Sequence, residues 1–170
     1  MATLVADTSA LVSLGTVSEP NRSPLSHCLD GYEVLVPEAV VAELEVIASY
    51  DDAHGRAASV VLDRRTAYAT QAVVLDTDFP LDDGENAAVT LANTEEAELL
   101  LCDEFTRLGL IHASLRNTRL VTTPTLLSVL VRKGRLTTED ARTVLDEISA
   151  ARSWEANSYV QRARSLLDPA

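Results

Sequence analysis

The sequence predicts an α/β fold in which a central, mainly parallel sheet of about five strands carries helices on both faces. The first reason is that short apolar runs alternate with segments whose apolar residues recur at helical spacing, up to about residue 122. The second is size, because a chain of 170 residues that is 46% hydrophobic buries a sizeable core as one domain. We therefore expect a single domain over residues 1–170, with a core over about 1–122 and a helical extension over about 123–170.

The first half of the chain holds three of the expected strands. The opening strand, residues 4–6, delivers Asp7 at its end, and Thr8 or Ser9 is in place to cap the following helix. Pro37 ends the second strand and opens a helix, because a proline at the first helical position lacks an N–H that would have no partner there. In order, we expect a strand at 4–6, a helix to about Val17, a helix at 25–29, a strand at 33–36, helices at 37–50 and 53–67, and a strand at 72–75.

The second half adds two strands and a series of helices. An acidic loop, 76–84, precedes a helix of small residues that Asp82 or Asp83 would cap. Residues Leu99–Cys102 form the most apolar run, which indicates a strand inside the sheet. In order, we expect a helix at 85–93, a strand at 99–102, a helix at 105–112, a strand at 119–121, and helices at 123–134, 137–150 and 154–167.

The charge balance is strongly acidic, with 26 acids against 14 bases and Lys133 as the only lysine. Such a surface is typical of salt-adapted proteins, in which high ionic strength screens self-repulsion, so we expect a halophilic, haloarchaeal-type source. The same excess of acids disfavours a simple basic groove for nucleic acid. A phosphate substrate would therefore have to be held by metal ions or by local arginines.

Composition also limits the compartment and the classes of site. No apolar run approaches the roughly 18 residues of a membrane span, and we expect a cytoplasmic protein without a membrane partner. Cys28 and Cys102 are too few for a disulfide framework, and Cys102 is expected to be a buried, reduced thiol. The three histidines do not form a zinc-binding spacing with these cysteines.

Four carboxylates stand at comparable places in their elements: two follow strands, Asp7 and Asp103, and two belong to helices, Glu43 and Glu85. Because the carboxyl ends of parallel strands meet at one edge of the sheet, we expect these acids to gather there. A carboxylate on an apolar face is costly unless it is paired or binds a cation, and the bases are sparse. Clustered carboxylates are ligands for Mg²⁺ or Mn²⁺, which activate water for phosphodiester hydrolysis. Any one of these acids, taken alone, is better explained as a helix cap or a solvated surface residue.

Four motifs in order, ADTSAL, VPEAVVAEL, DDGENAAVTLA and LLLCDE, resemble those of the PIN-domain nucleases, which include the VapC-like toxins of toxin–antitoxin pairs. The resemblance covers about residues 4–121, and the tail that follows is similar to one PIN subgroup. It implies a three-layer α/β/α fold with extra C-terminal helices. The implied activity is a ribonuclease that uses Mg²⁺ or Mn²⁺ and leaves a 5′-phosphate and a 3′-hydroxyl.

By this resemblance, the catalytic and metal-binding residues are Asp7, Glu43, Glu85 and Asp103. The supporting residues are Thr8, Ser9, Asp83 and Glu104, and the candidate contacts to nucleic acid are Arg107, Arg116 and Arg119. The pair Asp103-Glu104 stands where the subgroup usually has two aspartates, and Glu85 stands where most PIN domains have an aspartate. Neither departure removes a carboxylate.

The preferred hypothesis is therefore a metal-dependent endoribonuclease, with the toxin of a toxin–antitoxin pair as one form of it. Its partners would be an RNA substrate, a second copy of the chain in a homodimer, and a cognate antitoxin if the chain is a toxin. The alternative is a non-catalytic PIN-fold module that binds RNA or acts as a scaffold, and the intact set of four carboxylates disfavours it. A weaker alternative is a DNA nuclease or a nucleotide phosphohydrolase with the same metal chemistry.

Overall fold

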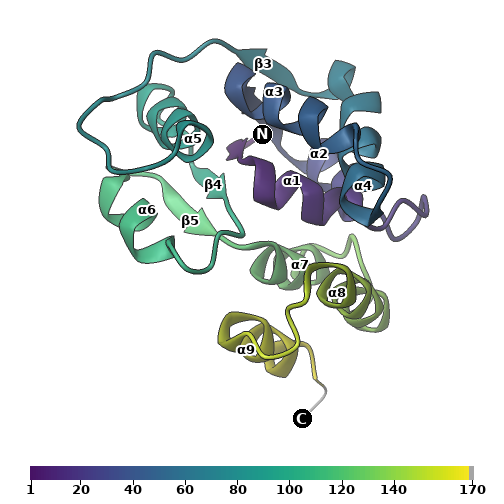
Figure 1. Cartoon of the computed structure of the whole chain (residues 1–170). Coiled ribbons are helices and arrows are strands. Elements are labelled where there is room, and N and C mark those ends of the chain that lie inside the picture. The colour runs from purple at the N-terminus through teal and green to yellow at the C-terminus, as the bar shows by residue number, and fades with distance from the viewer. Residues whose placement is uncertain (169–170) are drawn as a thin grey trace.

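The computed structural model describes residues 1–168, and it has a three-layer α/β/α fold around a five-stranded sheet (Figure 1). All strands are parallel, in the order β3-β2-β1-β4-β5. The strands are β1 (Thr3–Ala6), β2 (Glu33–Pro37), β3 (Ala69–Gln71), β4 (Leu99–Leu101) and β5 (Arg119–Val121). The predicted fold class is confirmed.

Nine α-helices within residues 1–168 cover the two faces of this sheet. They are α1 (Thr8–Gly15), α2 (Pro24–Gly31), α3 (Glu38–Ala48), α4 (Ala53–Asp63), α5 (Asp83–Thr94), α6 (Leu108–Ser114), α7 (Thr123–Arg132), α8 (Thr138–Arg152) and α9 (Ser158–Leu167). A short 3₁₀ helix, η1 (Arg65–Ala67), follows α4. The last three helices gather at one side of the molecule, drawn green to yellow in Figure 1. Within residues 1–168, no helix has the length and apolar character to cross a membrane.

The alternation of side chains along β1 assigns the helices to the two faces. Leu4 and Ala6 lie in a core that also contains residues of α1–α4 and α7–α9, whereas Val5 lies in a second core with α5 and α6. These three residues of β1 are fully buried because the strand is covered on both faces. Cys28 and Cys102 are free, buried thiols, as the sequence predicted for Cys102.

The register of the sheet places the ends of β1 and β4 side by side. Ala6 pairs with Leu101, and the backbone N–H of Asp7 donates to the Leu101 carbonyl at 3.1 Å. Asp7, the first residue after β1, and Asp103, the second residue after β4, therefore leave the sheet at the same edge. This placement follows from the parallel pairing of β1 with β4.

The strand predicted at 72–75 is wrong, and β3 lies at Ala69–Gln71 instead. The pairing of β2 with β3 ends where Pro37 faces Gln71, because α3 begins directly after Pro37. Residues 72–75 consequently have no strand beside them, and the side chain of Val74 is 91% exposed.

Three helix boundaries also differ from the prediction. The helix predicted at 53–67 ends at Asp63 and continues only as η1, the helix predicted at 105–112 begins at Leu108, and the one predicted at 154–167 begins at Ser158. In the last case the Asn157 side chain accepts from the N–H groups of Tyr159 and Val160, which sets the start of α9.

The helix caps place acids at the edge of the sheet where the strands end. Asp7, rather than Thr8 or Ser9, caps α1 by accepting from the N–H of Ala10 at 3.0 Å. Pro37 is the N-cap residue of α3 and not its first helical residue. Asp82 caps α5, as one of the two predicted possibilities.

Candidate active site

A pocket of about 200 Å³ lies at the carboxyl edge of the sheet, and five of the residues that line it are acidic. These acids are Asp7, Glu43, Asp82, Glu85 and Glu104. They come from four places in the chain: the end of β1, helix α3, the start of α5 and the loop after β4. We call this the acid pocket. Three of the four acids expected as metal ligands line it, and Asp103 does not.

Asp7 is the most strongly held acid of the pocket, with a side chain that is only 4% exposed. Its carboxylate accepts hydrogen bonds from Ser9 Oγ at 2.8 Å, from the N–H of Ala10 at 3.0 Å and from Cys102 Sγ at 3.0 Å. Burial raises the pKa of Asp7 to about 6, more than these hydrogen bonds lower it. A negative charge at this position is therefore costly until a cation comes near.

Asp103 lies next to Asp7 but its carboxylate faces the protein interior. Its Oδ1 atom accepts from the N–H of Thr123 at 2.7 Å, and its buried Oδ2 atom has no hydrogen-bond partner. Burial raises the pKa of this carboxyl group as well. Ser9 connects the two aspartates, because its hydroxyl donates to Asp7 and accepts from the N–H of Asp103 at 3.0 Å.

Glu43 reaches the pocket from α3, and two neighbours fix its carboxylate. Thr8 Oγ1 donates to Glu43 Oε2 at 2.8 Å. Gly84 makes room for the group, because a Cβ at this position would lie 2.0 Å from Glu43 Oε1. Burial raises the pKa of Glu43, and the charges of Asp82 and Asp83 raise it further. Asp83 itself is exposed and does not line the pocket.

Glu85 lies in the first turn of α5, with a side chain that is 8% exposed. Burial and the neighbouring charge of Asp82 raise its pKa, against the opposing effect of Arg107. Arg107 Nη1 forms an ion pair with Glu85 Oε2 at 3.1 Å. Among the residues that the structure describes, 1–168, Glu85 is the only acid of the pocket that forms an ion pair.

A family model described as a PIN domain matches residues 3–169 of this sequence. The chain belongs to the PIN-domain family. No curated protein matches the sequence significantly. PIN domains are in general nucleases, and family membership therefore supports a nuclease-type function for the chain.

The donors of this PIN domain are chemically suited to a hard divalent cation. The pocket offers carboxylate and hydroxyl oxygens, the donor atoms that Mg²⁺ and Mn²⁺ prefer. Burial raises the pKa of Asp7 and of Glu43, so that a nearby cation would favour the charged form of each carboxylate. The carboxylates are nevertheless each held by protein donors. Within residues 1–168, no group of three or more His, Cys, Asp or Glu side chains converges on one point to hold a metal ion.

The three arginines expected to contact nucleic acid lie in different places. Arg107 adjoins the acid pocket through its ion pair with Glu85. Arg116 and Arg119 lie at the opposite end of the sheet, before and at the start of β5, where the N–H of Arg116 donates to Asn93 Oδ1 and that of Arg119 to the Glu98 carbonyl. The structure therefore brings only one of the three to the acids.

Two charged residues that line the pocket, Asp82 and Arg152, were not expected from the sequence as parts of a site. Asp82 was expected only as a helix cap, a role that it fills. Arg152, the last residue of α8, lines the pocket from the C-terminal helices. The sequence offers no specific signal for it, since a basic residue in the last turn of a helix is explained by the helix dipole.

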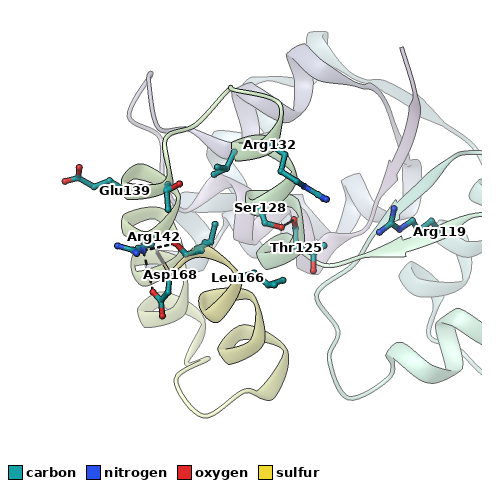
Figure 2. Close-up of a pocket in the computed structure, with 11 residues that line it drawn as sticks. Arg119, Thr125, Ser128, Arg132, Glu139, Arg142, Leu166 and Asp168 are labelled. Atoms are coloured by element: carbon teal, nitrogen blue, oxygen red, sulfur yellow. Dashed lines mark hydrogen bonds and ion pairs between the residues drawn. The ribbon is translucent and has the colours of Figure 1, made fainter. Parts of the chain in front are cut away.

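A larger groove, about 700 Å³, lies along helices α7–α9 and is separate from the acid pocket (Figure 2). Arg119 is the only residue from the expected site that lines it. Figure 2 shows Arg142 beside Asp168, an ion pair of 3.6 Å, with Arg142 Nε also donating to the Leu167 carbonyl. None of the four acids expected as catalytic residues reaches this groove, so we place the candidate active site of the PIN domain in the smaller acid pocket.

Proposed function

We propose that this PIN domain is a divalent-metal-dependent endoribonuclease that hydrolyses phosphodiester bonds at the acid pocket. The observation that carries the proposal is that Asp7, Glu43 and Glu85, from three separate elements, line one pocket with a single ion pair among its acids. Burying several carboxylates together with one basic partner among them is unfavourable for folding, and a cation that binds them offsets that cost.

The carboxylates of Asp7, Glu43 and Glu85 would hold Mg²⁺ or Mn²⁺. When bound, such an ion lowers the pKa of a coordinated water and neutralises charge on the leaving oxygen. The protein orients these ligands through hydroxyl groups, with Thr8 fixing Glu43 and Ser9 fixing Asp7. Asp103 acts through this network as a positioning residue, because its backbone N–H fixes the hydroxyl of Ser9.

RNA as substrate rests on the resemblance of the four motifs to PIN-domain ribonucleases. The same resemblance underlies a toxin role, a cognate antitoxin, a homodimer and products that carry a 5′-phosphate. For a toxin, the antitoxin would be a small protein that covers the acid pocket with a basic residue, because the pocket has an excess of negative charge.

The decisive experiment measures cleavage of total RNA with Mn²⁺ at high salt, comparing the wild type with Asp7→Asn. We expect Asp7→Asn to lower the cleavage rate by about 100-fold or more, and EDTA to abolish cleavage by the wild type. Asp63→Asn is the matched control, because Asp63 is exposed at the end of α4 and makes the same change of charge. Full activity of Asp7→Asn, or activity indifferent to EDTA, would contradict the proposal.

A non-catalytic RNA-binding module is the second candidate, and one observation favours it: within the described residues no three acids converge on a common point. Such a module would bind RNA equally well with Mn²⁺ and with EDTA, and would leave the RNA intact.

Parallel reactions with single-stranded and duplex DNA test the alternative that the protein is a DNA nuclease. Cleavage of DNA in preference to RNA would assign the metal chemistry to that function instead.

A further inference from the structure

Arg152 introduces a positive charge into the acid pocket. It is the only basic side chain among the residues that line the pocket in the described part of the chain, and the side chain is half-buried. It belongs to α8, in the helical segment after the last strand of the sheet. The pocket is therefore built from two parts of the chain, acids from the strand ends and one arginine from the C-terminal helices.

The position of Arg152 is determined by packing. Helix α8 ends at this residue, because Ser153 adopts a left-handed conformation (φ 58°, ψ 48°). The guanidinium carbon lies 5.9 Å from the centre of the Trp154 ring. Trp154 is buried and packs edge-to-face against Phe105 at 5.0 Å, and Phe105 follows the pair Asp103-Glu104 directly. The arginine is thus anchored to the same loop that brings Glu104 to the pocket.

The guanidinium group has acidic neighbours but no partner. Burial lowers the pKa of Arg152 by more than the charges of Asp103, Asp7 and Glu104 raise it. Within residues 1–168 it forms no ion pair within 4.0 Å and no hydrogen bond to a protein acceptor. A permanent counter-ion of the acids would stand at ion-pair distance from one of them. Arg152 therefore faces the pocket with free N–H donors.

A phosphodiester that enters this pocket meets mainly negative charge, in a protein whose net charge is −12. A guanidinium group matches the two non-bridging oxygens of a phosphate with two parallel N–H donors. We propose that Arg152 binds the phosphate group of the RNA at the acid pocket, as a substrate-binding residue supplied by the C-terminal helices. This inference rests on the proposed function, because it assigns a residue to the same site.

The test measures the affinity for a fluorescently labelled single-stranded RNA by anisotropy, in an Asp7→Asn background that keeps the RNA intact. We expect Arg152→Ala to weaken binding by about tenfold, and to reduce the slope of log affinity against log salt concentration by about 0.7. Arg152→Lys restores part of the affinity, because it keeps the charge without the paired donors. Arg162→Ala is the control for charge, since Arg162 is exposed on α9 and lines neither the pocket nor the groove.

A thermal unfolding curve for each variant separates binding from folding. If Arg152→Ala does not fold, Arg152→Gln replaces it, because glutamine keeps a long stem and a polar head without the charge. Equal RNA affinities for the Arg152 and Arg162 variants overturn the inference, and so does a higher RNA affinity of Arg152→Ala, which would identify a counter-ion.

Parallel cleavage assays distinguish this inference from the proposed function. If the protein with the native Asp7 cleaves RNA with Mn²⁺ while Arg152→Ala binds RNA normally, the proposed ribonuclease activity is supported and the proposed role of Arg152 is wrong. If the wild type does not cleave RNA, but loss of Arg152 weakens RNA binding as described, the ribonuclease is wrong and Arg152 belongs to an RNA-binding module. In the cleavage assay itself, we expect Arg152→Ala to raise KM more than it lowers kcat.

Discussion

Asp7 has two roles, as the N-cap of α1 and as a member of the acid pocket. One carboxylate oxygen accepts from the N–H of Ala10 in the cap, and both oxygens accept from Ser9. The structural explanation of this residue and the functional one are therefore compatible. The cap fixes the orientation of the carboxylate, which is what a metal ligand needs.

The raised pKa of Asp7 predicts how the stability of the metal-free protein depends on pH. The unfolded chain loses the proton near pH 3.8, whereas the folded protein keeps it up to about pH 6. Stability is therefore lost as the pH rises through this interval, by up to about 3 kcal/mol for this group. Asp7→Asn has no such loss, although asparagine accepts fewer hydrogen bonds. We expect its free energy of unfolding, relative to the wild type, to rise by about 1–3 kcal/mol between pH 4 and pH 7.

Urea unfolding in EDTA at a series of pH values measures this difference. Asp63→Asn serves as the control, and its difference from the wild type should not change over the same range. A difference between Asp7→Asn and the wild type that does not vary with pH would show that the Asp7 carboxyl group titrates normally.

Gly84 predicts a variant that impairs the site without weakening the fold. Gly84→Ala places a Cβ 2.0 Å from Glu43 Oε1, so the Glu43 carboxylate must turn away from its place beside Thr8. Since alanine suits the first turn of α5, we expect the free energy of unfolding to stay within about 1 kcal/mol. We expect the cleavage rate to fall at least tenfold. Gly109→Ala is the control, since nothing lies within 4 Å of its Cβ, and equal activity of the two variants would refute the role of Gly84.

At the scale of single residues, the sequence identified acids more readily than the residues around them. Glu43 and Glu85 stood out because each carboxylate interrupts an apolar face, which is unusual without a cation, and Asp7 stood out because it follows the first strand. The inward orientation of Asp103 was not predictable, because it depends on the N–H of Thr123, twenty residues away in the chain. Arg152 was not predictable either, since its position depends on how the last helices pack.

At the scale of elements, four of the five strands were predicted, and three of them, β1, β2 and β4, are apolar runs that are mostly buried between helices. The fifth was misplaced: residues 72–75 are apolar, but β3 is an edge strand whose own residues are mostly exposed. Its position is set by the length of β2 and by the start of α3 at Glu38. Sequence alone does not show where a neighbouring strand stops, so the apolar pattern was misleading at this edge.

The packing of α1 against α4 predicts that an alanine at Gly15, unlike one at Gly84, destabilises the fold. In Gly15→Ala the new Cβ lies 2.3 Å from the backbone carbonyl oxygen of Ala57 in α4. A backbone atom in a packed helix pair does not move aside as the end of a side chain does, so the two helices must separate. We expect a loss of about 2 kcal/mol or more in the free energy of unfolding, measured in urea. A loss no larger than that of Gly109→Ala would mean that the two helices adapt without strain.

At the scale of the whole molecule, the sheet and the C-terminal helices are joined next to the acid pocket. Phe105, in the loop after β4, packs against Trp154 and also stacks on Tyr159 at 5.6 Å. These contacts hold Arg152 and Glu104 at the same pocket. Trp154 and Tyr159 therefore dock the C-terminal helices on the loop after β4, and this docking places Arg152 at the acid pocket.

The net charge of −12 predicts that the stability of the whole molecule depends on salt. Folding brings the acids closer together, and this repulsion acts over about 30 Å at 0.01 M salt but only about 3 Å at 1 M. We expect the Tm to rise by about 5 °C or more between 0.05 M and 1 M NaCl. A variant with three exposed, unpaired acids neutralised (Asp30→Asn, Glu33→Gln and Asp63→Asn) should show a higher Tm at low salt and a smaller rise. An equal rise in both proteins would attribute the effect to the general action of salt on apolar burial, and not to the charge of the surface.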